Sequence, residues 1–84
     1  MKKYAVIVYY TFDIGSEVYL FDTYEQACEY LTSMWNYCFN FELKNEYFNK
    51  EESYCDKGYA ELAWDGNDKK IFEVTSVNEP MKFN

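Results

Sequence analysis

Residues 23–41 read TYEQACEYLTSMWNYCFNF, and this stretch decides the fold because it holds the clearest helical pattern in the chain. At about 100° per residue, one narrow arc of such a helix collects apolar side chains. These are Ala27, Leu31, Met34, Cys38 and Phe41. Thr23 followed by Gln26 matches a capping box at its start, and Asp22 is a competing cap residue. The pattern predicts a helix over residues 24–41 whose buried stripe covers an apolar sheet.

The sheet begins upstream of this helix. Residues 3–12 (KYAVIVYYTF) are rich in β-branched and aromatic side chains, which favour a strand. Both faces of this strand are apolar, so a central position in the sheet is expected. Residues 17–22 (EVYLFD) return as a second strand after a short turn that contains Gly15.

Two further strands are expected downstream of the helix. Residues 59–64 (YAELAW) and 70–77 (KIFEVTSV) flank the sequence DGND at 65–68, which is typical of a hairpin turn. Between the helix and this hairpin, residues 42–57 are polar and predict irregular structure or a short second helix. Residues 78–84 are expected to be a loose tail after the last strand, since Pro80 ends regular structure.

Together these elements predict a single domain over residues 1–84. Its class is α+β, a two-layer ββαββ sandwich with one main helix packed on a mostly antiparallel four-stranded sheet. We find no internal repeat and no linker in the 84 residues.

The charge balance excludes several kinds of partner. Eight lysines face 15 carboxylates, which gives a net charge of -7, and no arginine or histidine is present. Such a chain does not bind nucleic acid through its phosphates, and it is not attracted to anionic lipid. The longest apolar run, residues 4–10, is far shorter than the roughly 20 residues of a membrane span. We therefore expect a cytoplasmic protein that contacts neither membrane nor nucleic acid directly.

The sequence also has few of the side chains that carry out catalysis or bind metals. Cys28, Cys38 and Cys55 have no histidine to act as a base or to complete a metal shell, and we expect reduced thiols. The turn at 65–68 lacks the spacing of a calcium loop. The sequence predicts no catalytic residue, no metal site and no cofactor, so we do not expect an enzyme.

Carboxylates form the first candidate binding surface. Glu25 and Glu29, like Glu42 and Glu46, are spaced four residues apart, which places each pair on one face if helical. The candidate partner-binding residues are Glu25, Glu29, Glu42, Glu46, Glu51, Glu52 and Asp56. Such a surface either mimics the phosphates of a nucleic acid towards a basic protein or simply keeps the protein soluble. The sequence leaves both interpretations open.

Aromatic and aliphatic side chains on the sheet form the second candidate surface. We expect five of them to point away from the helix: Ile7, Tyr9, Tyr19, Phe21 and Ile71. An exposed apolar face of this kind often marks an interface, here between two copies of the chain. The alternative is that residues 42–57 fold over it.

Three stretches carry a resemblance to known proteins. MKKYAVIVYYTFD (1–13), VYLFDTYEQACEYLTSMW (18–35) and YAELAWDGNDKKIFEV (59–74) resemble small acidic uncharacterised proteins of Firmicutes and their phages, a pool that includes anti-CRISPR-type inhibitors. The resemblance implies the same ββαββ layout.

The functional hypothesis combines the charge pattern with this resemblance. It is a non-catalytic acidic protein-binding module, in its most specific form a phage-type inhibitor that mimics nucleic acid towards a host nucleic-acid-binding protein. The alternative is a small homodimeric cytoplasmic accessory protein that associates through the outer sheet face.

Overall fold

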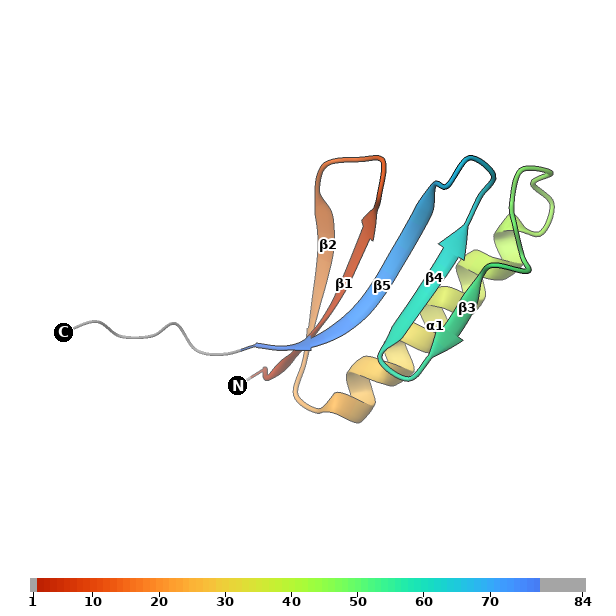
Figure 1. Cartoon of the computed structure of the whole chain (residues 1–84). Coiled ribbons are helices and arrows are strands. Elements are labelled where there is room, and N and C mark those ends of the chain that lie inside the picture. The colour runs from red at the N-terminus through yellow and green to blue at the C-terminus, as the bar shows by residue number, and fades with distance from the viewer. Residues whose placement is uncertain (1, 78–84) are drawn as a thin grey trace.

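The computed structural model describes residues 2–77, so the expected loose tail at 78–84 lies outside the described residues. The elements follow one another as β1 (Tyr4–Tyr10), β2 (Ser16–Phe21), α1 (Tyr24–Glu42), β3 (Tyr54–Asp56), β4 (Tyr59–Ala63) and β5 (Lys69–Ser76). The strands form one antiparallel sheet in the order β2-β1-β5-β4-β3. Helix α1 lies against one face of this sheet, behind the strands in Figure 1.

The expected four-stranded ββαββ sandwich is wrong, because within residues 2–77 the sheet has five strands and the fold is mostly β with a single helix. The additional strand, β3, lies within the segment 42–57 for which irregular structure or a short helix was expected. It pairs with β4 across a tight turn at Lys57 and Gly58. Gly58 has a φ of 82°, a left-handed conformation that glycine adopts without steric cost.

Two predicted hairpins and the central strand are confirmed. β1 pairs with β2 on one side and with β5 on the other, as expected of a strand with two apolar faces. In the turn between β4 and β5, Gly66 and Asn67 both have positive φ, at 87° and 71°. The Trp64 backbone N–H donates to the Asp68 carbonyl at 2.9 Å, so three residues lie between the paired positions, and Gly and Asn are the residues that adopt positive φ most readily.

The predicted helix is also confirmed. The Thr23 hydroxyl accepts a hydrogen bond from the Gln26 backbone N–H at 3.1 Å, and the helix ends at Glu42. The indole N–H of Trp35 donates to the Glu61 backbone carbonyl at 2.9 Å and so fixes α1 to β4. No helix within residues 2–77 is long and apolar enough to cross a lipid bilayer.

The core lies between α1 and the sheet. Its fully enclosed members come from the helix and from three central strands: Val6, Val8, Ala27, Leu31, Ala60, Leu62 and Phe72. Around them lies a ring of half-buried side chains, most of which are aromatic. Packing of this apolar surface is the main source of stability for such a small domain.

The predicted buried stripe is correct in the first half of α1 and wrong in its last turn. Ala27 and Leu31 are buried, but Phe41 is 71% exposed. The buried face instead follows the i,i+4 ridge through Trp35 to Phe39, whose rings stack at 4.7 Å. A helix that crosses a twisted sheet makes contact along such a ridge, which leaves the other edge of its stripe in solvent.

Candidate functional site

The predicted acidic surface is divided between two ends of the molecule. Glu25 and Glu29 are exposed in the first half of α1, whereas Glu42 is its last residue. The 19 residues of this helix span about 28 Å. Glu46, Glu51, Glu52 and Asp56 follow in the segment after the helix, all of them exposed. Glu29 and Asp56 line one shallow hollow between α1 and β3, so the structure brings these two together.

Glu42 and Glu46 do not form the expected helical pair. The helix ends at Glu42, so Glu46 lies in the following turn rather than on the same helical face. Glu42 is half-buried, and its Oε1 accepts a hydrogen bond of 2.8 Å from the indole N–H of Trp64. This carboxylate is therefore held in place beside an aromatic ring.

The expected outer sheet face is partly wrong. Val6 pairs directly with Tyr19, so Tyr19 and Phe21 share the helix side of the sheet with Val6. Both rings lie 5.1 Å from the ring of Tyr30 in α1. The Tyr19 hydroxyl donates to the Glu17 carboxylate, which raises the pKa of Tyr19 to about 12.

Ile7, Tyr9 and Ile71 do lie on the face opposite α1, as their register with one another requires. Ile71 is buried and Ile7 is half-buried, however, so neither is the main exposed group there. The exposed aliphatic side chains on this face include those of Val18 and Leu20, which sequence reasoning missed. A register shifted by one residue moves every side chain of a strand to the other face. Such a shift in β2 explains why Val18 and Leu20, rather than Tyr19 and Phe21, lie on the face opposite α1.

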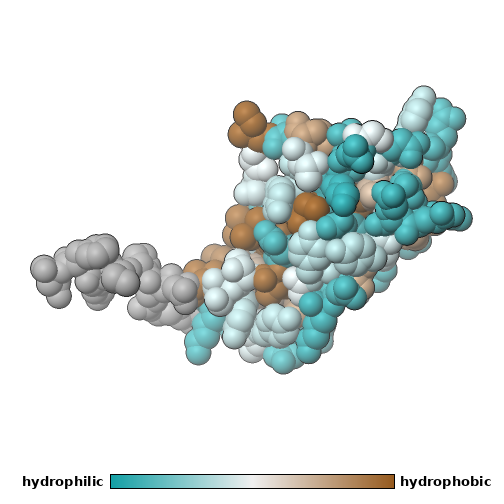
Figure 2. Space-filling model, viewed as in Figure 1, coloured by the Kyte–Doolittle hydropathy of each residue, from teal (hydrophilic) through white to brown (hydrophobic). Residues whose placement is uncertain are grey.

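The face of the sheet opposite α1 has an apolar half and a polar half. Figure 2, drawn from the same side as Figure 1, shows hydrophobic side chains mainly over β1 and β2 and hydrophilic ones mainly over β3 and β4. The segment 42–57 does not fold over the apolar half in the way proposed as an alternative. Its Phe48 packs against Phe39 and Trp64 on the helix side.

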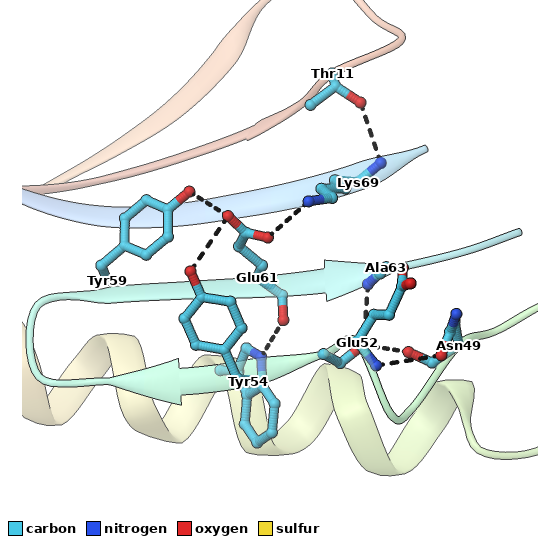
Figure 3. Close-up of polar contacts among 10 residues, drawn as sticks. Thr11, Asn49, Glu52, Tyr54, Tyr59, Glu61, Ala63 and Lys69 are labelled. Atoms are coloured by element: carbon cyan, nitrogen blue, oxygen red, sulfur yellow. Dashed lines mark hydrogen bonds and ion pairs between the residues drawn. The ribbon is translucent and has the colours of Figure 1, made fainter. Parts of the chain in front are cut away.

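A hydrogen-bonded cluster occupies the polar half of this face (Figure 3). The Glu61 carboxylate accepts from the hydroxyls of Tyr59 at 2.5 Å and Tyr54 at 3.4 Å, and from the Lys69 ammonium at 3.1 Å. We call these four residues the Glu61 cluster; they come from the three neighbouring strands β3, β4 and β5. The Glu61 side chain is only 12% exposed.

The electrostatics of the Glu61 cluster are those of a satisfied ion pair. The Tyr59 hydroxyl, followed by Lys69 and Tyr54, holds the pKa of Glu61 below its usual value despite partial burial. The same hydrogen bonds raise the pKa of Tyr59 and of Lys69. A carboxylate that is ionised and fully partnered stabilises the sheet and is not poised for proton transfer. Sequence reasoning missed it, although Tyr59 and Glu61 share a strand face at a spacing of two.

A groove lies on the helix side, where the turn between β4 and β5 approaches the end of α1. One part of it, which we call the Trp64 pocket, has a volume of about 550 Å³. Four aromatic side chains line it: Tyr10, Phe12, Tyr47 and Trp64. Three carboxylates complete the lining: Glu42, Asp65 and Asp68.

A second pocket of about 310 Å³ adjoins the first and shares Tyr10, Glu42 and Trp64 with it. Here the Lys70 ammonium lies 5.1 Å from the centroid of the Tyr10 ring and 3.7 Å from the Cys38 sulfur. Lys70 lines this second pocket and is not part of the Trp64 pocket. The sequence did not predict this groove, since residues 65–68 were considered only as a hairpin turn and as a calcium loop.

The three cysteines are free thiols. Cys28 is buried in α1, whereas Cys38 and Cys55 are half-buried. In the part of the chain that the structure describes, no group of three or more His, Cys, Asp or Glu side chains is placed to hold a metal ion.

Comparisons with models of protein families, with curated proteins and with solved structures find no match to this chain. In the described part of the chain the structure is a five-stranded antiparallel sheet with one covering helix, an acidic exterior and an aromatic groove.

Proposed function

We propose that this protein is a non-catalytic binding module whose acidic exterior docks on a basic surface of another protein. The observation that supports this is the lack of internal neutralisation. Among residues 2–77 the salt bridges are Lys2–Asp22 and Lys69–Glu61. None of the seven candidate carboxylates takes part in either, and all of them except the half-buried Glu42 are exposed, so their charge is available to a partner.

Exposed aromatic side chains add binding surface to this charge. Tyr37, Phe41 and Tyr47 are largely exposed near the end of α1. Tyr47 lines the Trp64 pocket, and Tyr37 and Phe41 line the adjoining one. Large aromatic side chains are enriched at interface hot spots, since they bury much area at little cost in entropy. In its most specific form the module is a phage-type inhibitor, of the anti-CRISPR kind, which competes with nucleic acid for a basic site.

The proposal is tested by capturing partners from a bacterial lysate on the immobilised chain. We expect the captured proteins to be basic nucleic-acid-binding proteins that added DNA displaces. We also expect them to elute at about 1 M salt, where the Debye length falls to about 3 Å and surface charge attraction is lost. Capture that survives high salt and ignores DNA would exclude the nucleic-acid-mimic form.

A charge-neutralised variant is the matched control for this capture. It replaces the exposed glutamates Glu25, Glu29, Glu46, Glu51 and Glu52 by glutamine, and none of these side chains forms a salt bridge within residues 2–77. The variant is expected to fold normally by circular dichroism and to capture little. Undiminished capture by it would remove the acidic exterior from the proposal.

Self-association through the outer sheet face is a second candidate, favoured by the exposure of Val18 (54%) and Leu20 (50%) on the edge strand β2. Light scattering at increasing protein concentration is expected to show a dimer, and Leu20→Lys is expected to abolish it. The matched control is Tyr37→Lys, which places the same charge on an exposed residue of α1. A strict monomer at high concentration would exclude this candidate.

A further inference from the structure

We infer that the Trp64 pocket holds an arginine side chain presented by the basic partner. This inference rests on the proposed function and makes it specific, because it assigns one pocket and one chemical group to the interaction. The pocket is lined by residues of the turn between β4 and β5 and by Glu42 at the end of α1. This turn and the end of the helix lie in the upper part of Figure 1.

The walls of the pocket suit a cation because four aromatic rings contribute to them. The rings of Tyr10 and Phe12 lie 5.0 Å apart, and those of Tyr10 and Trp64 lie 6.3 Å apart, tilted in both cases. A cation within about 6 Å of an aromatic centroid is attracted by the ring quadrupole, most strongly by that of tryptophan. Guanidinium also stacks on aromatic rings, which ammonium does not.

The chain itself shows that one of these rings accepts a cation. The Lys70 ammonium lies 5.1 Å from the centroid of Tyr10 and 5.4 Å from that of Phe72. Lys70 does this from the neighbouring pocket, so its charge does not fill the Trp64 pocket.

The charges of the pocket are all negative. Glu42, Asp65 and Asp68 line it, and within residues 2–77 none of them forms a salt bridge. The indole of Trp64 binds Oε1 of Glu42, which leaves Oε2 for another donor. Guanidinium presents five N–H donors in a planar fork, so it is able to bind several carboxylate oxygens while its plane lies on a ring.

Nuclear magnetic resonance of the full chain tests the inference, with acetyl-arginine amide as the probe and acetyl-citrulline amide as its neutral isostere. The two indole N–H signals provide an internal comparison, since that of Trp64 lies at the pocket whereas that of Trp35 is bound to the Glu61 carbonyl. We expect the arginine probe to shift the Trp64 indole and the amides of residues 65–68, and the Trp35 indole to stay unchanged. Equal shifts with citrulline, or none with arginine, would overturn the inference.

Two variants of equal net charge separate the pocket from the general acidity of the surface. Asp65→Asn with Asp68→Asn removes two charges at the pocket, and Glu25→Gln with Glu29→Gln removes two at the far end of α1. We expect the affinity for acetyl-arginine amide to be about 5- to 10-fold weaker in the first variant and less than twofold weaker in the second. The reason is that salt screens the attraction between charges beyond about 8–10 Å. Equal weakening in both would mean that binding follows net charge, which contradicts the pocket and leaves the proposed function standing.

A third variant tests the aromatic wall separately. Tyr47→Leu keeps an apolar side chain at this exposed position but removes its π-face. We expect affinity for the arginine probe to fall about two- to fivefold, and unchanged affinity would remove this ring from the site. Conversely, binding of the arginine probe in the Trp64 pocket by a chain that captures no basic protein from the lysate is a separate outcome. That outcome would contradict the proposed function and leave the pocket assignment standing.

Discussion

Phe72→Ala is expected to lower the free energy of unfolding by about 3–5 kcal/mol, because it empties the centre of the core. The Phe72 side chain is 0% exposed, and its neighbours across the sheet are Val8 of β1 and Ala60 of β4. Domains of this size have roughly 5–10 kcal/mol in total, so the variant is expected to keep only part of its stability. Urea unfolding followed by circular dichroism measures this, with a midpoint expected to fall by roughly 2–4 M.

Phe41→Ala is the matched control, since it makes the same replacement on a side chain that is 71% exposed. Alanine has a better helix propensity than phenylalanine, so the stability of this variant is expected to stay within about 0.5 kcal/mol of the parent. Similar losses of stability in the two variants would contradict the burial of Phe72 and the exposure of Phe41.

The contrast between these two phenylalanines also shows what a periodic pattern is able to predict. The pattern identified the helix, its cap at Thr23 and its end near Glu42, because all three depend on local sequence. It failed at Phe41, whose exposure depends on where the sheet ends beneath the helix. A helical wheel shows that residues share a face, but it does not show how far the opposite layer extends.

The number of strands in the sheet was underestimated for a related reason. β3 has only three residues, Tyr54–Asp56, in a stretch that is mostly polar. Its signal is the Lys57-Gly58 pair followed by Tyr59, since a two-residue loop with glycine joins antiparallel strands. So short a strand forms because β4 already provides an edge to pair with, and this is tertiary context rather than propensity.

The candidate sites depended on register, which the sequence specifies least. Placing Tyr19 opposite Val6 brings Tyr19 to the helix side and leaves Val18 and Leu20 exposed on the other. The Trp64 pocket combines residues from the first strand, the end of the helix and the last hairpin turn, such as Tyr10, Glu42 and Asp68. No local pattern relates positions that are so distant in the chain.

Glu61→Gln is expected to lower the free energy of unfolding by about 1–2 kcal/mol at neutral pH. The replacement keeps the shape of the side chain but removes the charge that Tyr59, Tyr54 and Lys69 share. Because the parent side chain is only 12% exposed, water compensates little for the lost interactions. Glu73→Gln is the control on the same face of the sheet: Glu73 forms no salt bridge within residues 2–77, so a change of less than about 0.5 kcal/mol is expected.

The pH dependence of the difference in unfolding free energy between the parent and Glu61→Gln identifies the charge of Glu61 as the cause of that difference. The folded pKa of Glu61 lies below its ordinary value of 4.5, so the carboxylate adds stability above pH 4.5 and loses it as the pH falls through the folded value. Lys69 and Tyr59 have raised pKa values instead, so their contribution is complete below their ordinary values of 10.5 and 10.0 and is lost as the pH rises through the folded ones. Urea unfolding should therefore show a constant gap between parent and Glu61→Gln from about pH 6 to 9 that narrows on either side. A gap that persists unchanged at about pH 3 would mean that the charge of Glu61 is not the cause of the difference in stability.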